Sequence, residues 1–147
     1  MKKTLLSCAL ALGLMGQAYA TEQITVPMTD VVNGHSAGSL VVAADQAGTI
    51  FYPQLTKMTG GLHQLTLLKD GNCSGLKGIT DSRVLAAKGN KQLPGIYVTE
   101  HDGSQNMVMV PQLTVSQLQG KALVIDMTAQ QDGQANKTDA QLVCGVI

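Results

Sequence analysis

The chain has 147 residues, of which 10 are basic and 10 acidic, and only 14% are charged and 3% aromatic. This length fits one domain of ordinary size. No apolar run reaches the roughly 18 residues of a membrane-spanning helix, so we expect no membrane span. The balanced charge provides no basic surface for nucleic acid, so we expect no nucleic-acid partner.

The first twenty residues, Met1–Ala20, have the anatomy of a secretory signal peptide. Two lysines follow the initial Met, Leu5–Gly16 is apolar, and Ala18-Tyr19-Ala20 forms a small-x-small cleavage site. We therefore predict that residues 1–20 are removed and that residues 21–147 form the domain, located in the periplasm or secreted. Cleavage would leave 8 basic and 10 acidic residues, a net charge of −2.

The site of signal cleavage and the compartment decide which cysteines remain and whether they form a disulfide. A lipoprotein signal ending at Cys8 is the rival interpretation, but it would leave almost no apolar segment before the modified cysteine. Cleavage after Ala20 leaves only Cys73 and Cys144 in an oxidising compartment such as the bacterial periplasm. A single disulfide is the default there, whereas a redox or metal-binding thiol pair would need a close spacing such as C-x-x-C.

The exported part alternates short apolar runs with Gly, Asn, Asp and Pro, a pattern typical of short antiparallel strands. The candidate strands are Gln23–Met28, Ser39–Ala44, Thr49–Pro53, Gly61–Leu68, Gly95–Glu100, Gln105–Val110, Ala122–Thr128 and Ala140–Val146. Eight strands of this length predict an all-β fold, an eight-stranded Greek-key barrel or sandwich.

Three connections carry distinct local signals. Asp102-Gly103, between two β-prone runs, predicts a hairpin turn with positive φ at Gly103. Thr114–Gly120 predicts one or two helical turns, with Thr114 as N-cap and Gly120 as the stop. The charged, glycine-containing segment Ser74–Gln92 predicts a long surface loop.

The histidine inventory limits metal chemistry. His35, His63 and His101 are the only histidines, and none stands at metal-ligand spacing from another histidine or from a cysteine. Strand alternation places His63 on the same side as Leu65 and Leu67. We therefore interpret His63 as a hydrogen-bonded structural residue and the other two as solvated.

Met107 and Met109 form an M-x-M pair on one face of a predicted strand. Thioethers are soft ligands for Cu(I), so this pair is a weak metal candidate. The interpretation that we favour is that one or both fill the core, because Met packs adaptably. Neither a nucleophile motif such as G-x-S-x-G nor a phosphate-binding loop is present.

Several short motifs, in order, resemble the bacterial periplasmic Cu/Zn superoxide dismutases, over nearly all of the chain from about residue 36 onward. They are Gly61-Leu62-His63, Gly71-Asn72-Cys73, Leu93-Pro94-Gly95 with Asp102-Gly103, Val110-Pro111, Lys121-Ala122-Leu123-Val124-Ile125 and Cys144-Gly145-Val146-Ile147. The resemblance implies an eight-stranded Greek-key β-barrel of that family. It also pairs Cys73 with Cys144 and makes His63 the family's structural histidine.

The metal ligands of that family do not carry over. Where the family reads G-x-H-G-F-H-x-H, the two copper-ligand positions hold Thr66 and Leu68, and the late-strand copper histidine falls on Asp126. The loop that supplies the zinc ligands in the family is much shorter here and contains no histidine. The arginine that guides superoxide in the family falls on Gln141.

These replacements predict an exported, dismutase-like protein without dismutase activity and without a cofactor, retained as a binding or structural module in the envelope. Its partner would be a second copy or an envelope protein. The alternative is a superoxide dismutase or copper-handling protein with copper or zinc at a non-standard site, drawing on Asp126, His63, Met107 and Met109. A third hypothesis is a small-ligand pocket lined by Leu68, Thr66 and the shortened loop, where the family's copper channel opens.

Overall fold

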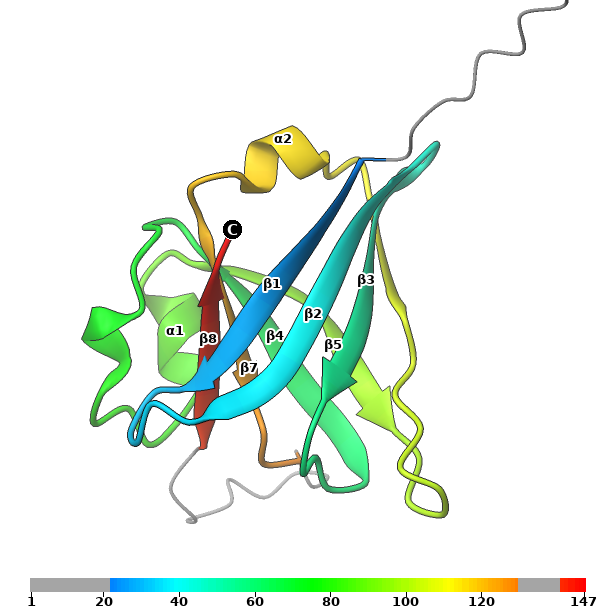
Figure 1. Cartoon of the computed structure of the whole chain (residues 1–147). Helices are drawn as coiled ribbons and strands as arrows, with labels where there is room; N and C mark the ends of the chain where they lie inside the picture. Colours follow the sequence, from blue (N-terminus) through cyan, green and yellow to red (C-terminus); the bar gives the residue numbers. More distant parts are fainter. Residues whose placement is uncertain (1–21, 130–140) are drawn as a thin grey trace, which may run out of the picture.

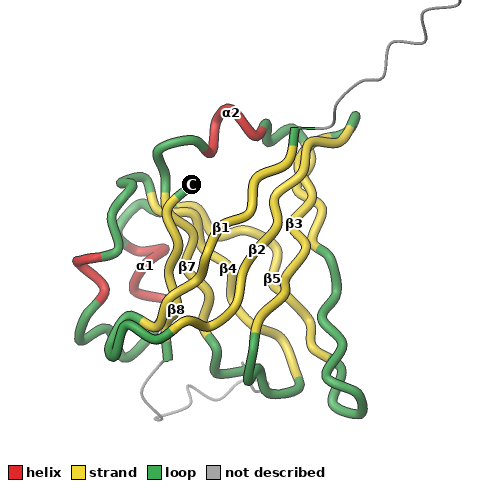
Figure 2. Tube along the Cα trace, in the orientation of Figure 1, coloured by secondary structure: helices red, strands yellow, loops and turns green. Residues whose placement is uncertain are grey.

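The computed structural model describes residues 22–129 and 141–147, which form a nearly closed antiparallel β-barrel (Figure 1). The strands are β1 (Gln23–Asp30), β2 (Ser36–Asp45), β3 (Gly48–Leu55), β4 (Gly61–Leu68), β5 (Lys91–Val98), β6 (Val108–Pro111), β7 (Ala122–Asp126) and β8 (Leu142–Val146); the helices are η1 (Ser74–Leu76), α1 (Arg83–Ala87) and α2 (Val115–Leu118). Figure 2 shows the strands forming the wall of the barrel, with α1 and α2 outside it.

The sheet order is β5-β4-β7-β8-β1-β2-β3-β6. The neighbours β4–β7, β8–β1 and β3–β6 are not consecutive in the chain, which is the Greek-key arrangement predicted from the sequence. The two end strands, β5 and β6, follow each other in the chain, and the connection between them folds back on β5 through the isolated bridge Val98–Gln105. The predicted all-β, eight-stranded barrel is therefore confirmed.

The barrel core is built mainly from aliphatic side chains, because Phe51 is the only phenylalanine in the chain and tryptophan is absent. Phe51 is fully buried in the main core, which also contains Val26, Leu40, Leu65, Ile96 and Leu123. Alternation along β1 and β2 supplies one inward residue in two, as expected for a sheet with one face in the core.

The strand β5 begins four residues earlier than the predicted Gly95 and ends at Val98. Proline within the strand did not prevent this, because Pro94 and Gly95 lie at a register irregularity where β5 faces Gln64 of β4. A bulge of this kind tolerates the missing N–H of proline. The strand ends where the chain turns, with the Gly103 N–H donating to the Thr99 carbonyl at 3.0 Å.

Two local predictions match the observed backbone. Gly103 has φ 68°, the left-handed conformation of the predicted turn. At α2 the Thr114 hydroxyl accepts from the Gln117 N–H and the Gln117 side chain accepts from the Thr114 N–H, at 3.4 and 2.9 Å. This capping box satisfies N–H groups that a four-residue helix would otherwise leave unpaired.

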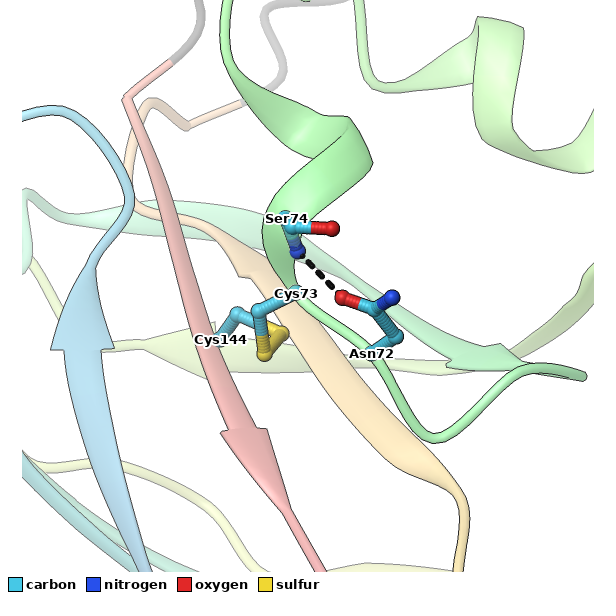
Figure 3. The surroundings of a disulfide bond; sticks show 4 residues. All are labelled: Asn72, Cys73, Ser74 and Cys144. Carbon is cyan, nitrogen blue, oxygen red and sulfur yellow. Dashed lines mark hydrogen bonds between the residues drawn. A yellow bond between two sulfur atoms is a disulfide. The ribbon is translucent and has the colours of Figure 1, made fainter.

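The predicted disulfide is confirmed. Cys73, immediately before η1, is bonded to Cys144 on β8, across 71 positions of sequence (Figure 3). The Asn72 side chain accepts a hydrogen bond from the Ser74 N–H at 2.7 Å and shapes the turn that presents Cys73. The bond therefore fixes the start of the β4–β5 connection to the far end of the chain.

Two predictions fall on parts outside the described residues: the signal peptide Met1–Ala20 and the start of the last strand at Ala140. Within residues 22–129 and 141–147, no helix has the length and apolar character needed to cross a membrane.

Candidate functional site

The three positions that the resemblance equates with copper ligands lie on one face of the β4–β7 pair. Thr66 and Leu68 of β4 stand opposite Val124 and Ala122 of β7, and Asp126 is the last residue of β7. Side chains alternate along a strand, and the intervening residues belong to the main core. The structure therefore brings Thr66, Leu68 and Asp126 to the outer side of the barrel wall.

This outer face is covered. The exposed fraction is 1% for Thr66, 5% for Leu68 and 7% for Asp126. A second group of apolar side chains packs over the face, separate from the main core, and we call it the lateral cluster. Its buried members are Leu68, Leu76, Leu85, Ala122, Val124, Leu142 and Cys144.

The prediction that Ser74–Gln92 is a long surface loop was wrong in part. The segment contains η1 and α1, and its last two residues already belong to β5. Leu76 and Leu85 are 4% and 2% exposed because they cover β4 and β7, which are buried on both faces. Side chains thus fill the place considered for a small-ligand pocket beside Leu68.

The polar atoms on this face bond to one another. The Ser82 hydroxyl donates to Gln64 Oε1 at 3.1 Å, and Gln64 Nε2 donates to the Thr66 hydroxyl at 3.4 Å. Asp126 Oδ1 accepts from the Thr128 N–H at 2.9 Å. These bonds satisfy polar groups that are buried, as a protein interior requires. The arrangement holds the covering segment against β4.

His63 lies on the opposite face of β4 and is fully buried. Its Nδ1 is 2.8 Å from the Asp126 carbonyl oxygen and its Nε2 is 2.7 Å from the Thr59 carbonyl oxygen. Coordination of a metal through either ring nitrogen would break one of these bonds. The geometry is that of a residue joining the start of β4 to the end of β7.

The described residues do not fit copper and zinc as the family would bind them. His35 lies in the β1–β2 turn and His101 in the β5–β6 connection, and both side chains are exposed, whereas the three ligand positions are buried. Among residues 22–129 and 141–147, no group of three or more His, Cys, Asp or Glu is placed to hold a metal ion. Leu68 has no lone pair and the Thr66 hydroxyl is a weak ligand, so neither replaces a histidine.

Gln141, which the resemblance equates with the family's steering arginine, contributes to a turn. Its Nε2 donates to Asp30 Oδ2 at 3.1 Å, while Asp30 Oδ1 accepts from the N–H groups of Val32 and Asn33 at 2.8 and 3.1 Å. Burial raises the pKa of the Asp30 carboxyl, but hydrogen bonds, chiefly from the Asn33 N–H and the Gln141 amide, outweigh burial and lower the pKa. A neutral amide here provides no positive charge.

The interpretation of the two methionines as core residues was wrong. Met107 is 62% exposed, and Met109 is partly exposed, whereas the neighbouring Val108 and Val110 are buried. The methionine pair therefore lies on the outside of the barrel, on β6 and the residue before it.

The residues that sequence reasoning missed are those that cover the outer face, Leu76, Ser82 and Leu85. A signal for them exists in β7, where Ala122–Asp126 is apolar at four consecutive positions. A strand without alternation is buried on both faces and needs a cover.

Comparison with known proteins agrees with the motifs. No family model matches the chain. It is 31% identical to the "Superoxide dismutase [Cu-Zn]" of Photobacterium leiognathi, an alignment covering 99% of this chain and 97% of that protein. It is 25% identical to "Superoxide dismutase [Cu-Zn] 1" of Salmonella typhimurium, over 100% and 99% of the two chains.

The fold has a solved counterpart as well. The Cu/Zn superoxide dismutase from Brucella abortus superposes with a TM-score of 0.62 at 19% identity, covering 86% of this chain and 99% of that one. At this identity the superposition supports the fold alone. The similarity to the Photobacterium protein extends over both chains almost completely, and this chain belongs to the Cu/Zn superoxide dismutase family.

Proposed function

We propose that this protein is an exported member of its family that does not dismutate superoxide and serves as a binding or structural module in the bacterial envelope. The domain would comprise residues 21–147 after removal of the signal peptide 1–20. The observation that carries the proposal is the chemistry of the buried face, where Thr66, Leu68 and Asp126 occupy the copper-ligand positions of the resemblance.

Copper dismutation needs a metal that cycles between two oxidation states, several nitrogen ligands and an open coordination position for superoxide. The three ligand positions of the resemblance offer one carboxylate and one hydroxyl, both engaged in hydrogen bonds. The lateral cluster packs over this face, so the residues at these positions are covered. None of the three copper-ligand positions of the resemblance holds a histidine, which supports loss of the activity more strongly than a single missing histidine would.

A binding role needs a surface, and the barrel has one at β4 and β5. Leu62 and Tyr97 are cross-strand partners and are 43% and 46% exposed. Paired apolar side chains on a strand face are a common element of protein contacts. The proposed partner is a second copy of the chain or another envelope protein that covers this pair.

The first test is elemental analysis of the protein purified from its native exported compartment, with sulfur counting the protein. We expect far less than one copper or zinc per chain. The second is a superoxide dismutation assay after reconstitution with both metals, with the Photobacterium leiognathi enzyme as positive control. We expect no activity above that of the free metals.

Stoichiometric metal together with dismutation would overturn the proposal and favour a non-standard metal site. His63→Ala and Asp126→Ala would then be measured first. Stoichiometric metal that is retained through purification and lost in Asp126→Ala, without dismutation, would instead identify a copper-handling protein and contradict the proposed binding or structural role.

A further inference from the structure

Two exposed methionines form an unusual feature on the outside of the barrel. Val108 and Val110 of β6 point into the main core, so alternation turns Met107 and Met109 to the outer face. Met107 is the more exposed of the two, at 62%.

The other described methionines behave differently. Met28 and Met127 are buried, and Met58 is partly buried and packs against the main core. Methionine is normally among the most buried residue types because its thioether is apolar and adapts to irregular gaps. Packing in the core therefore does not explain why positions 107 and 109 hold methionine.

The strands β3 and β6, beside the pair, carry no charged side chain. β6 pairs with β3, with Met109 opposite Ile50, and alternation puts Tyr52, 39% exposed, on the same outer face. Hard cations, which prefer oxygen ligands, find no carboxylate on these two strands.

The spacing suits shared coordination by two sulfurs. Residues two apart along a strand are separated by about 6.7 Å and project in the same direction. Methionine has three rotatable side-chain bonds, so the two thioethers can converge on one ion above the strand. Thioether sulfur is a soft ligand and selects a soft monovalent ion such as Cu(I).

We propose that Met107 and Met109 form a surface site for Cu(I), bound through the two thioether sulfurs. The step is coordination and release of the ion, with no change of oxidation state. With two protein ligands and a solvent-facing position, the site would exchange its ion readily. It lies on β6, away from the buried face of β4 and β7, and does not depend on the proposed function.

The test uses Ag(I) as a redox-inert probe of the full exported chain with its disulfide intact, in chloride-free buffer. Methionine methyl groups labelled with ¹³C are followed by NMR. We expect the Met107 and Met109 methyl signals to shift together and saturate at one Ag(I) per chain, while the Met58 signal stays in place. Zn(II) should leave both signals unchanged.

Variants make the test specific. The double variant Met107→Leu/Met109→Leu keeps the side-chain size at exposed positions, so the fold is retained, and it should lose the first equivalent of Ag(I). Met58→Leu is the matched control and should keep it. The affinity for Cu(I) is then measured by competition with bicinchoninate, with ascorbate as reductant. We expect the wild type and Met58→Leu to bind Cu(I) equally and the double variant to bind it more weakly.

Three outcomes would overturn the proposal. One is tight Ag(I) uptake by the double variant, since the exposed histidines would then be the ligands. Another is a shift of only one of the two methyl signals. The third is saturation of both signals by Zn(II) as readily as by Ag(I).

Discussion

Replacing Leu85 by alanine tests whether apolar packing holds the segment that covers the buried face. Leu85 is the buried residue of α1 and is 2% exposed, and it packs in the lateral cluster with Leu68 and Val124. A five-residue helix is far below the roughly 12–15 residues at which helices become marginally stable alone, so its position depends on tertiary contacts.

The burial of the Leu85 side chain sets the expected loss of unfolding free energy. Removing a buried leucine side chain costs about 2–5 kcal/mol, and the cost is smaller where the surroundings can close the cavity. Because α1 is short and lies on the surface of the wall, part of the cavity can collapse, and we expect about 2–3 kcal/mol for Leu85→Ala. The free energy of unfolding is measured by urea titration with the disulfide intact and EDTA present.

Val84→Ala is the matched control, because Val84 precedes Leu85 on the same helix and is 42% exposed. We expect its unfolding free energy to stay within about 0.5 kcal/mol of the wild type. A Leu85→Ala change as small as this control would refute the argument that the lateral cluster holds the segment. A urea midpoint of the Met107→Leu/Met109→Leu variant that rises on adding copper and zinc would refute the view that the buried face is held by packing without a metal, because ligand binding to the folded state raises stability.

Three further perturbations follow from the structure. Reducing the Cys73–Cys144 disulfide, which spans 71 positions, should lower the unfolding free energy by about 4 kcal/mol in the chain-entropy model; equal urea midpoints with and without dithiothreitol would contradict this. His63→Ala should cost about 2–4 kcal/mol because it removes a buried ring together with its contacts to the Asp126 and Thr59 carbonyl oxygens, whereas His101→Ala, at an exposed position, should leave the thermal midpoint unchanged. Asp30 has a lowered pKa in the folded state, so its stabilisation is present above the unfolded pKa of about 3.9 and is lost as the pH falls through the lower folded value. Asp30→Asn should therefore be less stable than wild type at pH 7, and urea titrations should converge as the pH drops below about 4; a constant difference would contradict the assignment.

The parts of the fold that were predictable are those set by local signals. The predicted strand Gly61–Leu68 has the same bounds in the structure, because glycine precedes it and polar residues follow it. The helix after Thr114 was predictable for the same reason, since an N-cap threonine and Gln117 act within one turn. The position of Gly103 in its turn required only the Asp-Gly pair.

The covering of the outer face was not predictable from local signals. Leu76 and Leu85 stand among lysines and glycines, a composition that favours a solvated loop. Their burial depends on β4 and β7, which are neighbours in the sheet although more than 50 positions separate Leu68 from Ala122 in the sequence. Likewise, the outward orientation of Met107 depends on which face of β6 meets the core, and a strand of four residues gives too short a pattern to decide that.

The identity of the residues on the outer face and the presence of their cover are physically coupled. A leucine at position 68 on the outside of the barrel would be exposed without Leu85 and Leu76, and burying one leucine contributes about 1.5–3 kcal/mol. The same apolar cover would be unfavourable over an ionic metal site, since charged groups lose hydration when enclosed by hydrocarbon. Cys144 is itself a member of the lateral cluster, so its bond to Cys73 holds the covering segment where this packing requires it. Placing histidines at positions 66, 68 and 126 alone would therefore bury three polar rings beneath an apolar layer, and a metal site would also require Leu76 and Leu85 to be replaced.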